Sequence, residues 1–138
     1  MITKGSISMN KKIDDILTSL AKSNFRSRFH LTDRDVSYID EHGLDMIEHH
    51  ARDFLTTRIR KRLPNDGKQT PMKGHPVFIA QHATATCCRG CINKWYALPL
   101  ARDLNDEEID FLTSIIMCWI KTNYNSIKNE AVTDLKNR

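Results

Sequence analysis

A Pro- and Gly-rich stretch near the middle of this 138-residue chain constrains its fold more than any other feature. Residues 64–76 read Pro-Asn-Asp-Gly-Lys-Gln-Thr-Pro-Met-Lys-Gly-His-Pro, with three prolines and two glycines. Proline lacks a backbone N–H, and glycine weakens regular elements through its conformational entropy. The stretch therefore excludes a helix interior or a central strand, and we expect a long loop of the kind that often carries function.

Helical periodicity dominates the sequence on both sides of this loop. Apolar residues at spacings of three and four predict helices over residues 13–20, 32–39, 44–63 and 105–124. Thr32 or Asp33 can cap the second of these helices. Asn105 with Glu108 has the spacing of a capping box at the start of the last one. Pro64 ends the third helix, because proline cannot continue it.

The predicted fold is mainly α: a small single-domain helical fold with a central loop that carries a Cys/His cluster. Residues 88–97 are expected to form a short helix opened by the cysteines. Residues 77–80 are apolar and too few for periodicity to decide between a minor β element and a helical turn. We expect a flexible N-terminus over residues 1–10, one globular domain over residues 11–125 and a polar C-terminal tail over residues 126–138.

Composition and cysteine usage indicate a cytoplasmic protein. Hydrophobic residues make up 40% of the chain and aromatic residues 7%, so the core should be mostly aliphatic. The longest apolar run, residues 115–120, is far shorter than the roughly 20 residues of a membrane helix. The first ten residues contain no apolar segment of a secretory signal. Three of the four cysteines are bunched, unlike a spaced extracellular disulfide framework, so we expect reduced thiols.

Cysteine and histidine concentrate directly after the loop. Residues 75–95 contain three of the four cysteines and two of the six histidines. Cys88 and Cys91 form a Cys-x-x-Cys pair, the usual half of a zinc site, and Gly90 between them allows a tight turn. This pair predicts a metal site, with zinc as the expected ion.

The remaining ligands of such a site are less well specified by the sequence. His82, six residues before Cys88, is the best third ligand. The fourth could be Cys87, His75 or a more distant residue such as His49 or His50. It could also be water, which would make the site catalytic.

Three other interpretations of the cluster stay open. A thiol redox pair at a helix N-terminus would have a lowered thiol pKa, aided by Arg89. A single nucleophile could be Cys87 or Cys88, with His82 or His75 as its base. The cysteines could also be buried as small hydrophobic residues, with the histidines satisfied by hydrogen bonds.

An enzyme is therefore the alternative to a metal-binding protein without activity. Its open metal position or activated cysteine would do hydrolytic or redox chemistry in a pocket beneath the 64–76 loop. The polar residues expected to line that pocket are Gln69, Thr70, His75, Gln81, Thr84 and Thr86.

A local basic stretch suggests a partner. The net charge is only +4, but six of the basic residues fall between residues 56 and 74, beside a single acid, Asp66. Such a patch can attract nucleic acid or a ligand that bears phosphate. The alternative is a solvated helix end whose cations face its C-terminal dipole. The six residues are Arg58, Arg60, Lys61, Arg62, Lys68 and Lys73.

Three long motifs carry a resemblance to a known family. Residues 25–30 (Phe-Arg-Ser-Arg-Phe-His), residues 64–72 and residues 74–95 resemble the bacterial DUF4186 family, a domain of unknown function. The similarity extends from about Leu20 to Trp119 and implies no established activity. Family members tend to have histidine where this chain has Tyr96, and tyrosine is not a usual zinc ligand.

Overall fold

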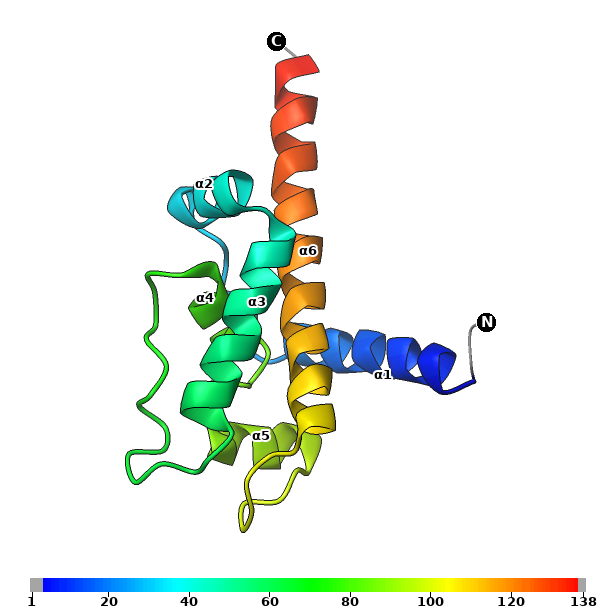
Figure 1. The fold of residues 1–138 in the computed structure, drawn as a ribbon. Coiled ribbons are helices and arrows are strands. Elements are labelled where there is room, and N and C mark those ends of the chain that lie inside the picture. The colour runs from blue at the N-terminus through cyan, green and yellow to red at the C-terminus, as the bar shows by residue number, and fades with distance from the viewer. Residues whose placement is uncertain (1–3, 137–138) are drawn as a thin grey trace.

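The computed structural model describes residues 4–136 and is built from α-helices (Figure 1). The described residues contain no β-strand, so the prediction of a mainly helical fold is confirmed. A 3₁₀ turn, η1 (Arg26–Arg28), and a π-helical turn, η2 (Leu55–Ile59), lie between the longer elements. The six helices are α1 (Lys4–Ala21), α2 (Asp33–His42), α3 (Leu44–Phe54), α4 (Pro76–Ala83), α5 (Arg89–Tyr96) and α6 (Asp106–Lys136).

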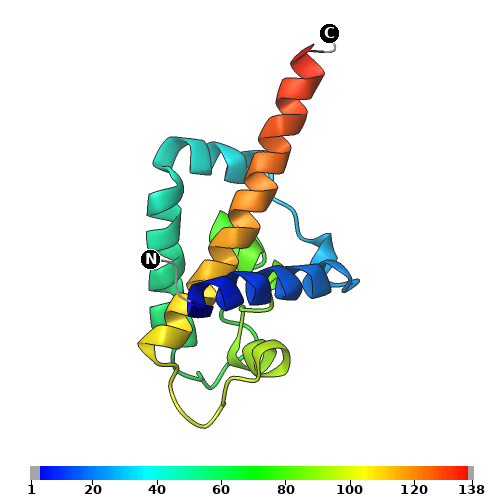
Figure 2. The same cartoon turned by 90° about the vertical axis from the view of Figure 1, so that its right-hand side faces the viewer.

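Helix α6 is the central helix of the fold. Helices α3 and α4 pack along one side of it, and α1 crosses it on another side (Figures 1 and 2). The aliphatic core lies between these helices, as the composition predicts. Each fully buried aliphatic side chain contributes on the order of 1.5–3 kcal/mol to stability. Those with no exposed surface include Ile47, Ala51, Leu55, Ile59, Val77, Leu112, Ile116 and Ile120.

Side-chain caps start two of the helices at the predicted residues. Thr32 accepts a hydrogen bond from the backbone N–H of Asp35, whose carboxylate accepts from the N–H of Thr32. Asn105 Oδ1 accepts from the N–H of Glu108 at 2.8 Å, and Glu108 Oε1 accepts from the N–H of Asn105 at 2.9 Å. Both arrangements are capping boxes, which satisfy N–H groups that lack a partner within the helix.

The helix predicted over residues 44–63 ends earlier than its periodicity indicates. Helix α3 stops at Phe54, and the wider turn η2 follows, with the N–H of Arg60 bonded to the carbonyl of Leu55 at 2.7 Å. The carbonyl of Arg60 accepts from the N–H of Leu104 at 3.0 Å and from the guanidinium of Arg89 at 2.6 Å. These contacts with distant residues take the place of further helical hydrogen bonds.

The segment with the undecided residues 77–80 is helical, so a minor β element is not present there. Pro76 occupies the first turn of α4, where its missing N–H costs nothing. His75 caps the helix, because its Nδ1 accepts from the N–H of Val77 at 3.0 Å. The cap residue and the proline at its start therefore favour a helix here, where periodicity alone does not distinguish a helix from a strand.

Both ends of the described chain are helical. Helix α1 includes residues 4–10 of the segment predicted as flexible, and α6 continues through the predicted tail and projects beyond α2 (Figure 1). Lys128 Nζ lies 2.7 Å from a carboxylate oxygen of Asp40 in α2, and the hydroxyl of Tyr124 donates to the same carboxylate. Residues 1–3 and 137–138 lie outside the described part. No described helix is long and apolar enough to span a membrane.

Candidate metal centre

Three cysteines meet where α5 begins. The Sγ atoms of Cys87, Cys88 and Cys91 all lie within 4.8 Å of one another. Cys88 is the N-cap residue of α5, and its Sγ accepts from the N–H of Cys91 at 3.3 Å. A cap and the third residue of a helix share one side of its first turn, so the Cys-x-x-Cys spacing brings both sulfurs together. Cys87 adds a third sulfur from the turn before the helix.

The turn between α4 and α5 is held by buried polar groups. Ala85 has a φ of 58°, in the left-handed region that disfavours side chains larger than glycine. Thr84 Oγ1 donates to the carbonyl of Ala80 at 2.7 Å and lies 3.0 Å from Thr86 Oγ1. Tyr96 donates its hydroxyl to the carbonyl of Thr84. The two threonines therefore fix the backbone that presents the cysteines.

Two more of the residues predicted to line a pocket, Thr70 and Gln81, also bond to this region. Thr70 Oγ1 donates to the carbonyl of Cys87 at 2.8 Å, and Gln81 Nε2 donates to the carbonyl of Thr86 at 3.2 Å. Gln81 Oε1 is buried without a partner among the described residues. The loop at residues 64–76 thus rests against the cysteine turn.

Asp66 fastens that loop to the first turn of α5. Its Oδ1 accepts from the backbone N–H of Arg89 at 2.9 Å, and its Oδ2 accepts from the N–H of Gly90 at 3.0 Å. Burial acts to raise the pKa of Asp66, but the hydrogen bonds from Gln69, Arg89 and Gly90 hold it below its usual value. In the sequence, Asp66 stands out only as the lone acid of a basic stretch, because its capping role depends on a contact across 23 residues.

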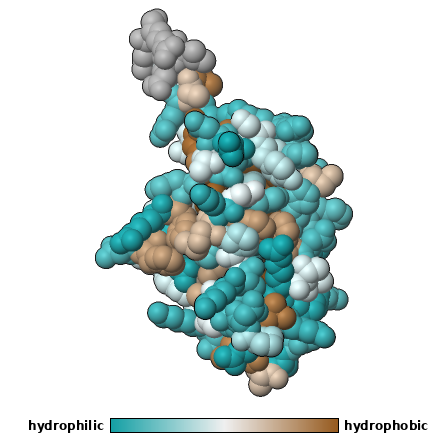
Figure 3. Space-filling view, turned by 90° about the vertical axis from the view of Figure 1, so that its left-hand side faces the viewer, coloured by the Kyte–Doolittle hydropathy of each residue, from teal (hydrophilic) through white to brown (hydrophobic). Residues whose placement is uncertain are grey.

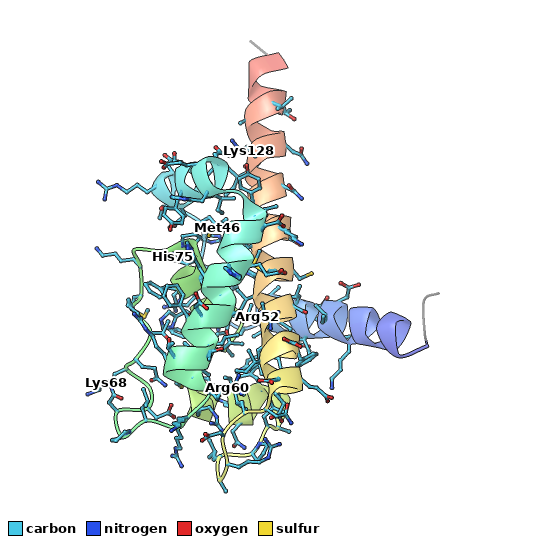
Figure 4. The ribbon with its side chains drawn as sticks, viewed as in Figure 1. Met46, Arg52, Arg60, Lys68, His75 and Lys128 are labelled. Atoms are coloured by element: carbon cyan, nitrogen blue, oxygen red, sulfur yellow. The ribbon has the colours of Figure 1, made fainter. Side chains whose placement is uncertain are left out.

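Arg89 is a structural residue and not a partner of the thiols. Only 1% of its surface is exposed, and its guanidinium donates to the carbonyls of Arg60 at 2.6 Å, Pro99 at 2.5 Å and Arg102 at 2.7 Å. Figure 4 shows Arg60 at the lower end of the segment that follows α3. The expected influence of Arg89 on a thiol therefore falls to another residue.

That residue is Arg26, which reaches the cysteines from η1. Its Nη2 lies 3.2 Å from Cys91 Sγ, and its Nη1 lies 3.7 Å from Cys87 Sγ. Nη1 also donates to the carbonyl of His82 at 2.7 Å. Arg26 is not among the site residues that the sequence predicts, because 61 residues separate it from Cys87. Its position within the aromatic and basic motif of residues 25–30 was the one signal available.

The contacts among these groups favour a single thiolate, located on Cys91. Hydrogen bonds from Cys87, from Cys88 and from Arg26 outweigh the desolvation of Cys91 and lower its pKa to about 5. The hydrogen bond to Cys91, together with burial, raises the pKa of Cys87 far above its usual value. Burial is the main cause of the raised pKa of Cys88. The three thiols therefore titrate as one coupled group.

His82 lies beside the cluster and is bonded elsewhere. Its Nε2 lies 3.1 Å from the carbonyl oxygens of both Thr70 and Pro71, and its ring stacks on Phe29 with the centroids 5.4 Å apart. A ring nitrogen that faces two carbonyl oxygens carries a hydrogen and donates it. Within residues 4–136, the group of metal-ligating atoms that meet within 4.8 Å contains the three cysteines and neither of the two predicted histidines.

His75, labelled in Figure 4, belongs to a separate aromatic cluster, in which its ring lies against those of His50 and Tyr38. Its Nδ1 accepts from Val77, so the neutral ring carries its hydrogen on Nε2, which lies 3.1 Å from His50 Nδ1. Burial, followed by the proximity of His50, lowers the pKa of His75 to about 4. The structure therefore gives His75 the role of a neutral helix cap that donates to His50.

The six residues of the basic stretch have different surroundings. Arg60 donates to the carbonyl of Leu104 and to the carboxylate of Asp106, both at 2.9 Å. Arg58 lies over the rings of Phe54 and Phe78, 5.1 and 5.3 Å from their centroids. The other four are exposed; Lys68 is at the outer edge of the loop (Figure 4), and the face that contains the loop is largely hydrophilic (Figure 3). Those four are Lys61, Arg62, Lys68 and Lys73.

A comparison with known families covers most of the chain. The model of a family described as a domain of unknown function, DUF4186, matches residues 14–121. The match includes η1 with Arg26, the 64–76 loop and all three clustered cysteines. No solved structure matches the chain.

Proposed function

The chain belongs to the DUF4186 family, and we propose from the geometry of its own residues that it is a metal-binding protein whose ligands are Cys87, Cys88 and Cys91. The observation that carries the proposal is the meeting of the three Sγ atoms within 4.8 Å at a helix N-terminus. Thiolates are preferred ligands of Zn²⁺, which is the ion we propose. Such ligands must be reduced, in keeping with the predicted cytoplasmic location.

The sulfur positions fit a zinc ion with small adjustments. Four ligands at Zn–S distances of about 2.3 Å stand about 3.8 Å apart in a tetrahedron. The three Sγ atoms lie within 4.8 Å of one another, so rotation of the cysteine side chains can bring them to that spacing. Three thiolates leave one tetrahedral position for a ligand other than these residues. An enzyme would need this open position for water or substrate. A metal-binding protein and a metal enzyme would therefore use the same three ligands.

Arg26 supplies the charge that such a site requires. Three thiolates around Zn²⁺ carry one net negative charge, which is costly at a largely buried position unless it is paired. The guanidinium contacts two of the sulfurs at 3.2 and 3.7 Å, and hydrogen bonds of this kind orient metal ligands and neutralise them.

Metal analysis of the purified protein tests the proposal. After purification without chelators and with reduced thiols, mass spectrometry should find about one equivalent of zinc per chain. The double variant C88S/C91S should lose it. The matched control is C118S, because Cys118 lies in α6 outside the cluster and should leave the metal content unchanged. Less than about one tenth of an equivalent of any transition metal would contradict the proposal.

The lowered pKa of Cys91 favours a second candidate function, chemistry at an activated cysteine. A thiolate that persists at neutral pH is the reactive form in both nucleophilic and redox sites. Among the described residues no histidine joins the three sulfurs, so Arg26 and the neighbouring thiols would do the activation. Metal-free protein in which Cys91 reacts with iodoacetamide no faster than Cys118 at pH 6 would remove this candidate.

Binding of nucleic acid or a phosphorylated ligand remains a prediction of the sequence. Because Arg60 is bonded within the chain, the exposed residues Lys61, Arg62, Lys68 and Lys73 would make the contacts. Gel shifts over a salt series test this. Binding without a negative slope of log K against log salt concentration would eliminate phosphate contacts.

A further inference from the structure

A cleft separate from the three sulfurs lies where α1, η1 and α6 meet. Its volume is about 240 Å³, and residues of α1, η1 and α6 line it. Figure 2 shows how α1 crosses α6. The volume of the cleft is below the roughly 300–1,000 Å³ of sites for drug-sized molecules, so its ligand must be small. The lining is largely apolar and includes Leu17, Leu20, Phe29 and Trp119, with Arg26 and His30 as its ionisable residues.

The charge of the cleft selects the kind of ligand. No carboxylate is among its lining residues, whereas Arg26 brings a permanent positive charge. A cleft with apolar walls and one cation is complementary to a ligand that has an apolar body and one anionic group.

Arg26 has donors left for such a group. A guanidinium carries five N–H donors, and the structure accounts for three of them, on His82, Cys87 and Cys91. These contacts use Nη1 and Nη2, whereas Nε has no hydrogen-bond partner among the described residues, which leaves the edge formed by Nε and Nη2 for a ligand. Two parallel N–H groups on one edge of arginine match the two oxygens of a carboxylate.

We propose that this cleft binds a small carboxylate with an apolar tail. Its carboxylate would accept from the free edge of Arg26, and its tail would lie along Leu17, Phe29 and Trp119. The inference shares Arg26 with the proposed metal site but does not require the metal, because none of the three cysteines lines the cleft.

Hexanoate and its neutral counterpart hexan-1-ol are the probes. In ¹H–¹⁵N NMR titrations of the full chain, hexanoate should shift the indole signal of Trp119 saturably, with a Kd of about 1–5 mM. Hexan-1-ol should bind at least about tenfold more weakly, because it lacks the second oxygen and the charge. Equal affinity for the two probes, or no saturable shift at Trp119 with hexanoate, would overturn the proposal.

Two variants separate the charge from the space. S27D places a carboxylate on the cleft wall and should weaken hexanoate about tenfold while leaving hexan-1-ol unchanged; S37D, at an exposed position on α2, is the matched control. L17W fills the cleft and should weaken both probes. Unchanged hexanoate affinity in S27D and L17W, with both variants folded by circular dichroism, would refute the site. Metal content measured on the same samples shows whether the cysteine site succeeds or fails on its own.

Discussion

At the scale of single residues, the arginine that contacts the thiols is not the one that the sequence predicts. Arg89 lies inside the Cys-x-x-Cys motif, yet its guanidinium is buried on three backbone carbonyls. Arg26 lies much earlier in the sequence, in η1, and contacts two of the sulfurs. Proximity in sequence predicted the wrong cation, because an arginine side chain at the start of a helix can point away from its neighbours.

Replacing Arg26 should therefore change the chemistry of Cys91. R26Q removes a positive charge and its hydrogen bond from the thiolate, so the pKa of Cys91 should rise from about 5 by at least about one unit. The rate of alkylation by iodoacetamide against pH, with the site of modification mapped by mass spectrometry on metal-free protein, measures this. R28Q is the control, because Arg28 is exposed on the same turn and contacts none of the sulfurs. A pH profile of R26Q that coincides with that of R28Q would show that the guanidinium does not stabilise the thiolate.

At the scale of elements, α4 shows how a side chain decides a short helix. His75 can cap it only while the ring is neutral, because protonation would put a hydrogen on the nitrogen that accepts from Val77. His50 and His42 also face this ring and disfavour its protonation, whereas Asp35 favours it. Burial and the histidine neighbours prevail, and the folded pKa of about 4 lies below the usual 6.5.

The stability of the fold should consequently depend on pH through His75. Since the folded pKa is lowered, its contribution is fully present above pH 6.5 and is lost as the pH falls from 6.5 towards 4. Because the ring is partly solvent-screened, we expect a loss of about 1–2 kcal/mol, measured by urea unfolding at pH 7 and pH 4.5. H75N keeps a good capping residue without a titrating ring and should flatten this part of the dependence. An unchanged pH dependence in H75N would assign the effect to other groups.

At the scale of the whole molecule, the helices were largely predictable and their mutual contacts were not. Apolar spacing and capping boxes are local signals, and they located the first residues of α2, α3 and α6 to within one residue. The three clustered cysteines are near neighbours in sequence, so their grouping was also visible. Arg26 and Asp66 join the site through contacts across 61 and 23 residues, for which a single sequence carries no pattern. The same reason explains why the helical run through η2 stops short of residue 63: the carbonyl of Arg60 accepts from Arg89 and Leu104 instead.

The overall shape predicts that the end of α6 contributes little to stability. Among the side chains that the structure describes, those of residues 129–133 are exposed, and the last ones that contact the rest of the fold are Ile127 and Lys128. A chain that stops after Asn129 should therefore lose less than about 0.5 kcal/mol in urea unfolding. The contrasting variant I127A removes a side chain that packs against the core and should cost more. A truncation as costly as I127A would show that the projecting helix has a partner.

The place of α6 along the chain has a consequence for synthesis. The ribosome makes the chain from the N-terminus, so Cys87, Cys88 and Cys91 leave it before α6, against which α3 and α4 pack. Until α6 is synthesised, α4 lacks the helix against which it mainly packs. The cysteines that follow α4 are then more exposed to solvent than in the finished fold. The interval between these two events is when the thiols are most open to oxidants and to competing metal ions.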